Sequence, residues 1–171
     1  MTQPPEFKFD RLFDAPREMV WTTWTDPELL AHWYGPGVTT IIHKFDLEPG
    51  GLWLNEMQWG DKSDFSKMIF QEVDPPEKLV WHHCSADAQW NIAPSQMMPD
   101  WPRKLLTTVI FEDLGQQTNV KLSQIPMDAT DKEAACFAEF MNNMQNGWGS
   151  GYKLIDELLE KLLSDKGQKK N

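Results

Sequence analysis

The stretch that decides the fold of this chain is residues 130–163, TDKEAACFAEFMNNMQNGWGSGYKLIDELLEKLL. We predict that it forms one helix of about nine turns. Thr130 and Glu133 have the spacing of a capping box, which satisfies backbone N–H groups at a helix start. The apolar residues that follow recur at spacings of three and four and therefore share one side of the helix: Ala134, Phe137, Met141, Met144, Trp148, Gly151, Ile155, Leu158 and Leu162. This broad apolar side requires an equally large apolar partner surface.

The residues upstream are expected to supply that surface as a curved antiparallel sheet. Alternating patterns bounded by turn sequences predict strands at 6–13, 38–46, 52–59, 65–73, 78–85, 104–114 and 117–125. Two short helices are predicted after the first strand, one capped by Asp14 with Pro16 in its first turn, and one restarting at Asp26. Helices segregated from a series of strands indicate an α+β fold, with the sheet wrapped around the long C-terminal helix and the short helices closing one end.

Length, charge and hydropathy limit the class of protein. At 171 residues we expect one domain, 1–171, with flexible ends at 1–5 and 164–171. The net charge of −10 argues against nucleic acid and against an anionic membrane surface as partners. There is no apolar run of membrane-spanning length, and the N-terminus lacks the charged and apolar regions of a signal peptide. A cytoplasmic protein is therefore expected.

Tryptophan and methionine are abundant, with nine of each. Large flat and soft side chains fill cores, but they also line adaptable apolar pockets. Both interpretations stay open for the inner faces of the predicted strands and helix. The second one places a small hydrophobic or aromatic ligand between sheet and helix. Its candidate binding residues are Trp53, Met57, Trp81, His83, Met141, Met144, Trp148 and Gly151.

Glycines interrupt the predicted helix at Gly147, Gly149 and Gly151. Three interior glycines cost about 2–3 kcal/mol relative to alanine, so a local advantage should offset them. One explanation is a kink or the close approach of another backbone. The other is that the missing side chain of Gly151 leaves room for a ligand beside Trp148, and we favour this one.

Metal chemistry has one candidate motif, His82-His83-Cys84. Alternation along a strand turns His83 to the face opposite His82 and Cys84, and no second Cys/His cluster follows at zinc-like spacing. We therefore expect no metal and no cofactor. The distant pair Cys84 and Cys136 makes no disulfide framework, and we expect Cys136 to be a buried structural residue although a thiol near a helix start can be reactive.

Catalytic chemistry has little support in the sequence. His83, Asp46, Glu56 and Glu72 could approach one cavity, although alternation turns both glutamates away from Trp53. The chain contains no nucleophile elbow, phosphate-binding glycine loop or HExxH motif. His83 could act as an acid or base, orient a ligand, or be a satisfied core residue. We assign no catalytic residue and favour a binding protein over an enzyme.

Several blocks of sequence occur together in a familiar order: 11–21 (RLFDAPREMVW), 24–30 (WTDPELL), 33–36 (WYGP), 46–51 (DLEPGG), 75–80 (PPEKLV) and 147–148 (GW). The chain thereby resembles bacterial SRPBCC proteins of the Hsp90-ATPase-activator-homologue (AHSA1-like) group. The resemblance implies the helix-grip fold shared with Bet v 1 and START domains, in which a curved sheet grips a C-terminal helix and a cavity lies between them.

The resemblance does not imply one function, because the superfamily contains lipid carriers, hormone receptors, aromatases and cyclases, and a co-chaperone domain. We predict binding of a small hydrophobic molecule. A cavity-based enzyme of the cyclase, aromatase or hydrolase type is one alternative, and a partner of an Hsp90 homologue is another. Eukaryotic relatives that stimulate Hsp90 carry an additional N-terminal domain, which we expect to be absent because this chain begins almost at its first strand. A homodimer stays open.

The segment 86–103 is longer than the corresponding segment in most relatives. Long segments without regular structure are often lids or binding loops. The alternative is a surface Ω-loop held by its own Trp and Met residues.

Overall fold

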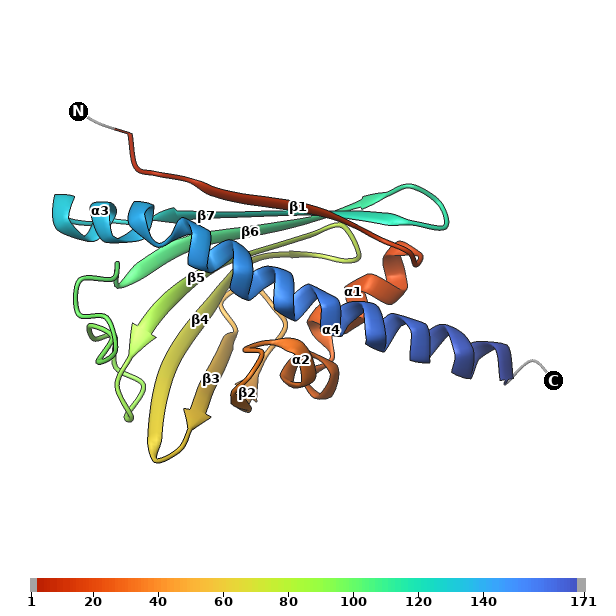
Figure 1. The fold of residues 1–171 in the computed structure, drawn as a ribbon, viewed down its shortest axis with the longest axis horizontal. Coiled ribbons are helices and arrows are strands. Elements are labelled where there is room, and N and C mark those ends of the chain that lie inside the picture. The colour runs from red at the N-terminus through yellow and green to blue at the C-terminus, as the bar shows by residue number, and fades with distance from the viewer. Residues whose placement is uncertain (1–2, 169–171) are drawn as a thin grey trace.

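A computed structural model describes residues 3–168, which fold into one antiparallel sheet and four helices. The seven strands are ordered β1-β7-β6-β5-β4-β3-β2. Figure 1 shows α4 crossing one face of the curved sheet, so the predicted α+β helix-grip fold is confirmed. In chain order the elements are β1 (Phe7–Phe13), α1 (Arg17–Thr25), α2 (Pro27–Trp33), β2 (Thr39–Phe45), β3 (Leu52–Trp59), β4 (Lys62–Asp74), β5 (Lys78–Ala86), β6 (Lys104–Asp113), β7 (Thr118–Pro126), α3 (Asp131–Glu139) and α4 (Met141–Gln168).

The sheet is built from consecutive hairpins, with one exception. The first strand, β1, pairs with the last, β7, and Phe7 lies opposite Gln124. Helices α1 and α2 then carry the chain to the other edge of the sheet, where β2 begins. The pairing register shifts within β2–β3 and within β4–β5, between Phe70 and Glu72 in the second case. Such bulges bend a strand and increase its twist, which suits a sheet that curves around a helix.

The prediction of one helix over residues 130–163 is wrong in one respect, because the structure has two helices there. The capping box is present: Glu133 N donates to the Thr130 hydroxyl at 3.1 Å, and Thr130 N donates to the Glu133 carboxylate at 2.9 Å. However, α3 ends at Glu139, and Phe140 has φ −93° and ψ 1°. The break coincides with a tertiary contact, since the Phe140 ring packs against Trp101 with ring centroids 5.7 Å apart. Periodicity alone does not report such a contact.

One predicted helix cap is absent from the structure and another is present. Asp14 does not cap α1, because Pro16 itself occupies the cap position and Asp14 lies two residues earlier. Asp26 does cap α2, since its carboxylate accepts from Glu28 N at 3.0 Å. The end predicted to be flexible at 164–171 is helical as far as Gln168, and residues 1–2 and 169–171 of the predicted flexible ends lie outside the described residues.

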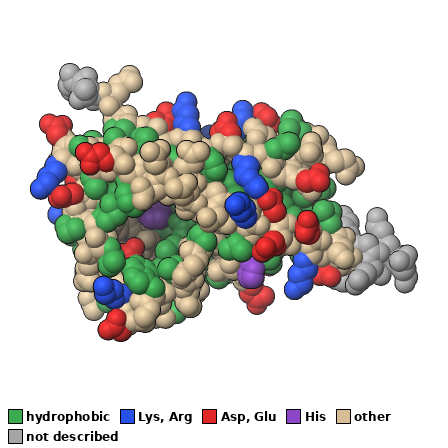
Figure 2. Space-filling model, in the orientation of Figure 1, with side chains coloured by type: hydrophobic (Ala, Val, Ile, Leu, Met, Phe, Trp, Pro, Cys, Tyr) green, Lys and Arg blue, Asp and Glu red, His purple; other side chains and the backbone are tan. Residues whose placement is uncertain are grey.

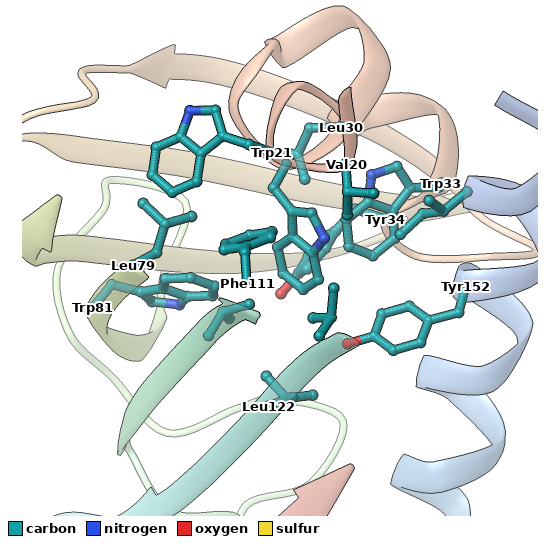
Figure 3. Close-up of a cluster of buried hydrophobic side chains, with 14 of the residues drawn as sticks. Val20, Trp21, Leu30, Trp33, Tyr34, Leu79, Trp81, Phe111, Leu122 and Tyr152 are labelled. Atoms are coloured by element: carbon teal, nitrogen blue, oxygen red, sulfur yellow. The ribbon is translucent and has the colours of Figure 1, made fainter. Parts of the chain in front are cut away.

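An aromatic core fills the space between the sheet and the helices near α1 and α2. Figure 3 shows Trp21 and Trp33 from these helices opposite Trp81 and Phe111 from the sheet, with Tyr152 reaching in from α4. Trp24 is at the centre of ring contacts with centroid separations from 4.7 to 6.4 Å. Its partners are Trp33, Trp81, Phe111, Trp148 and Tyr152.

Candidate functional site

A cavity of about 410 Å³ lies between the sheet and the C-terminal helices, at the end where β3 turns into β4. Figure 2 shows a hollow with hydrophobic side chains around it and a histidine side chain inside it. His83 is the histidine that lines the cavity. The full lining is Trp33, Tyr34, Gly35, Pro36, Met57, Trp59, Asp64, Ser66, His83, Ser85, Ser95, Met97, Met98, Trp101, Leu105, Gln124, Phe140, Asn143, Met144, Gly147, Trp148 and Gly151.

The structure brings most of the predicted binding residues together around this cavity. Met57 and His83 line it from the sheet, and Met144, Trp148 and Gly151 line it from α4. Strand alternation and helical periodicity placed these side chains on the inner faces, where the structure has them.

Three of the predicted residues, Trp53, Trp81 and Met141, are not part of the lining. Trp53 and Trp81 are only 2% and 1% exposed, and their ring centroids lie 5.7 Å apart in the packed core beside the cavity. Met141 is partly buried and packs against the same core at the start of α4. Alternation identified the inward face correctly, but it does not report how far along a strand the core is filled.

The sequence patterns pointed to His83 but not to the other polar residues of the cavity floor, which are Asp64, Ser66 and Ser85. Ser66 of β4 lies opposite Ser85 of β5, and Met68 lies opposite His83. Asp64 and Ser66 line the cavity together with His83 and Ser85, so adjacent strands place four polar side chains next to one another. Ser85 lies two residues after His83, and Ser66 lies two residues before Met68. Strand alternation could therefore have predicted that both serines face the same side of the sheet as these residues.

Burial controls the charge of the groups on this floor. It lowers the pKa of His83 to about 4, so the imidazole is neutral at pH 7. Its Nδ1 is buried and has no hydrogen-bond partner among residues 3–168. Burial raises the pKa of Asp64, and burial followed by the nearby Asp64 charge raises the pKa of Tyr34. None of the described lining residues is a Lys or Arg.

The segment 86–103 connects β5 to β6 and forms part of the cavity lining. Ser95, Met97, Met98 and Trp101 from this segment line the cavity. Trp101 packs on α3 and the helix break, with ring centroids 5.3 Å from Phe137 and 5.7 Å from Phe140.

The other end of this segment packs on the opposite face of the sheet, because Phe65 alternates with the cavity-lining residues Asp64 and Ser66. The Trp90 ring centroid is 5.3 Å from both His43 and Phe65. The segment is therefore anchored by contacts with the rest of the protein as well as by its own side chains.

The glycines of α4 have different surroundings. A Cβ added to Gly151 would lie 3.1 Å from the Trp33 carbonyl oxygen and 3.2 Å from Trp33 Cε3, whereas one added to Gly147 would meet nothing within 4 Å. Close approach of α2 therefore accounts for Gly151, contrary to the explanation that we favoured. Gly147 is the glycine with open space beside the cavity. The helix has no break at these glycines, because α4 runs unbroken from Met141.

Comparison with known proteins agrees with this architecture. The family described as Activator of Hsp90 ATPase homolog 1-like protein matches residues 14–160. The chain belongs to this family. Solved structures of other proteins share its fold. No curated protein matches the sequence significantly.

Three solved structures illustrate the likeness. Protein Ms6760 from Mycobacterium smegmatis has a TM-score of 0.75 and 22% identity over 90% of each chain. A protein from Arthrobacter aurescens has a TM-score of 0.76 and 22% identity over 91% of this chain and 86% of its own. A protein from Staphylococcus epidermidis has a TM-score of 0.74 and 19% identity over 94% of this chain and 93% of its own. At these identities the likeness shows the fold alone.

In this member of the Activator of Hsp90 ATPase homolog 1-like family, the acidic residues that the sequence offered as catalytic candidates lie away from the cavity. Asp46, Glu56 and Glu72 are not among its lining residues. The Glu56 carboxylate accepts from Ser63 Oγ at 2.6 Å and Gln58 Nε2 at 2.8 Å, and it lies 2.8 Å from His43 Nε2. These hydrogen bonds, the one from Ser63 most strongly, lower the pKa of Glu56. Glu56 is therefore part of a separate polar network.

The structure also gives the surroundings of the potential metal ligands and of the two cysteines. Among residues 3–168, no three His, Cys, Asp or Glu side chains come close enough to hold a metal ion. Cys84 is buried and Cys136 is half-buried, both are free thiols, and burial raises the pKa of both. Within the same part of the chain, no helix has the length and apolar character needed to cross a membrane.

Proposed function

We propose that this protein binds a small hydrophobic or aromatic molecule in the cavity between the sheet and α4. The observation that carries the proposal is the cavity itself, whose volume of about 410 Å³ lies within the range of small-molecule sites. Trp33 and Trp148 offer it flat apolar surfaces, and Met57, Met98 and Met144 offer flexible ones. Methionine side chains adapt to irregular shapes, which suits a site that accepts a rigid ring system.

The charges around the cavity favour a neutral ligand. Tight recognition of phosphate or carboxylate normally uses Arg or Lys, and the described lining residues include neither. The one carboxyl group among the described lining residues, Asp64, offers an anion no attraction. A molecule whose surface is mostly apolar therefore fits the site best.

Tryptophan fluorescence tests the proposal directly, because Trp33 and Trp148 line the cavity. We expect saturable quenching by 1-naphthol and none by 1-naphthyl phosphate at the same concentrations. The Gly147→Leu variant should weaken 1-naphthol binding at least tenfold, because its side chain enters open space at the cavity.

The matched control is Gly149→Leu, two residues along the same helix. Gly149 does not line the cavity, and its nearest neighbour would be Phe9 Cζ at 3.9 Å from an added Cβ. This control should bind 1-naphthol within about twofold of the wild type. Binding of the phosphate alone, or equal weakening by both substitutions, would contradict the proposal.

A further inference from the structure

We propose that His83 selects ligands that carry a neutral hydroxyl group, by forming the hydrogen bond that orients the ligand on the cavity floor. The inference rests on the proposed function and names the ligand class for the same cavity. Its basis is a cluster of polar side chains on β4 and β5 that faces a mainly apolar wall from α4 and the segment 86–103.

The floor is polar because two neighbouring strands turn short polar side chains inward side by side. Ser66 and Ser85 are paired across β4 and β5, and His83 lies two residues before Ser85 on the same face of β5. The opposite wall, from α4 and the segment 86–103, presents Met144, Trp148 and Met98. A ligand that matches both surfaces has an apolar body and one polar end.

His83 is the floor residue with a buried polar side-chain atom that lacks a hydrogen-bond partner among the described residues. Its partners across the neighbouring strands are Met68 and Leu105, which offer no side-chain hydrogen bond. Nδ1 is buried without a partner among residues 3–168, which is costly for a polar atom. The ring lines the cavity and Nδ1 is buried, so we infer that Nε2 is the nitrogen that can reach a bound molecule.

The charge state of the floor favours a hydroxyl over an ionic group. A neutral imidazole has one donor and one acceptor nitrogen, and a hydroxyl group can pair with either. Burial keeps the pKa of His83 far below 7, so the ring supplies no positive charge to hold an anion. Burial also raises the pKa of Asp64, which works against a charge on that carboxyl.

A pair of probes with the same shape tests the inference. 1-Naphthol and 1-methylnaphthalene differ by a hydroxyl in place of a methyl group. By titration calorimetry, the wild type should bind 1-naphthol at least tenfold more tightly. His83→Phe keeps a ring but removes both nitrogens, so the preference should fall below threefold while 1-methylnaphthalene affinity changes by less than about threefold.

The chain offers a matched control and a conservative variant. His82 is the neighbouring residue on β5 and does not line the cavity, so His82→Phe should keep the full preference. His83→Gln retains a side chain that can hydrogen-bond and should keep part of the preference. This second variant separates loss of the hydrogen bond from general damage to the floor.

The outcomes distinguish this inference from the proposed function. If both naphthalenes bind but His83→Phe leaves the preference intact, the role of His83 is refuted and the binding cavity stands. Tighter binding of 1-naphthylmethylamine than of 1-naphthol would also refute the hydroxyl class, because it would assign selection to the Asp64 charge. If neither naphthalene binds, both proposals fail.

Discussion

The concave side of the sheet is filled at one end and hollow at the other, although the same elements form both ends. On β5, Trp81 and His83 are two residues apart and face the same way. Trp81 is 1% exposed and packs against Trp24, Trp53 and Phe70. His83 instead lines the cavity. Within two residues, β5 therefore passes from the packed core to the cavity.

The difference lies in what covers each end of the sheet. Helices α1 and α2 place Trp24 and Trp33 over the filled end, where they meet Tyr152 of α4. The hollow end is covered by the helix break at Phe140 and by the segment 86–103. Trp148 belongs to both ends, since it stacks on Trp24 with ring centroids 6.0 Å apart and also lines the cavity. No residue of α1 lines the cavity, which therefore forms beyond the part of the sheet that α1 covers.

The largest expected contrast comes from truncating one large residue at each end. Trp24→Ala should lower the free energy of unfolding by about 3–5 kcal/mol, because it removes a ring at the centre of the aromatic core. Met57→Ala should cost less than about 1 kcal/mol, because Met57 already borders open space. Urea unfolding at pH 7 measures both. Equal losses would show that the cavity end is packed as tightly as the core.

The next effect is a pH dependence that arises from His83 at the hollow end. The folded-state pKa of His83, about 4, lies below the ordinary 6.5, so between these values the unfolded chain binds more protons. Stability should therefore fall as the pH drops from 6.5 to 4, by at most about 3 kcal/mol. Urea unfolding across this range should show a shallower decline for His83→Phe than for the wild type.

A comparison of these two proteins isolates His83 from other groups. Glu56 has a lowered pKa, so its stabilisation is present above the ordinary carboxyl pKa and is lost as the pH falls through the folded-state value. Both proteins share that loss. Parallel stability profiles between pH 4 and 6.5 would mean that His83 titrates normally in the folded protein.

A smaller contrast separates the two glycines of α4 that line the cavity. Gly151→Leu should destabilise the protein by about 1–3 kcal/mol, because the new side chain meets the backbone and ring of Trp33. Trp33 cannot yield easily, since it is 1% exposed and its indole N–H donates to the Thr23 carbonyl at 2.8 Å. Thermal melting measures the effect. A stable Gly151→Leu protein that no longer binds 1-naphthol would restore the ligand explanation for this glycine.

The smallest expected effect has the opposite sign. Gly147→Ala should raise the free energy of unfolding by about 0.5–1 kcal/mol, because alanine favours a helix and its Cβ meets nothing within 4 Å. Chemical unfolding at pH 7 would detect it, with 1-naphthol affinity measured in parallel. A loss of stability would mean that the space beside Gly147 is not open.

The sequence by itself determined the local features of this protein. Alternation located all the strands and turned Met57 and His83 inward, and the capping box fixed the start of the C-terminal helices at Thr130. The spacing of three and four turned Met144 and Trp148 toward the sheet. These features depend on backbone geometry over a few residues, which a sequence pattern records directly.

Only the tertiary structure decided which inward-facing residues meet another side chain and which meet open space. Trp81 and His83 carry the same signal in the sequence, yet Trp24 covers one and the cavity lies over the other. The break at Phe140 likewise coincides with a contact to Trp101, which belongs to a segment that the sequence patterns did not place. Periodicity describes the direction of a side chain relative to its own backbone. Whether that direction is filled depends on residues distant in the chain, and therefore on packing.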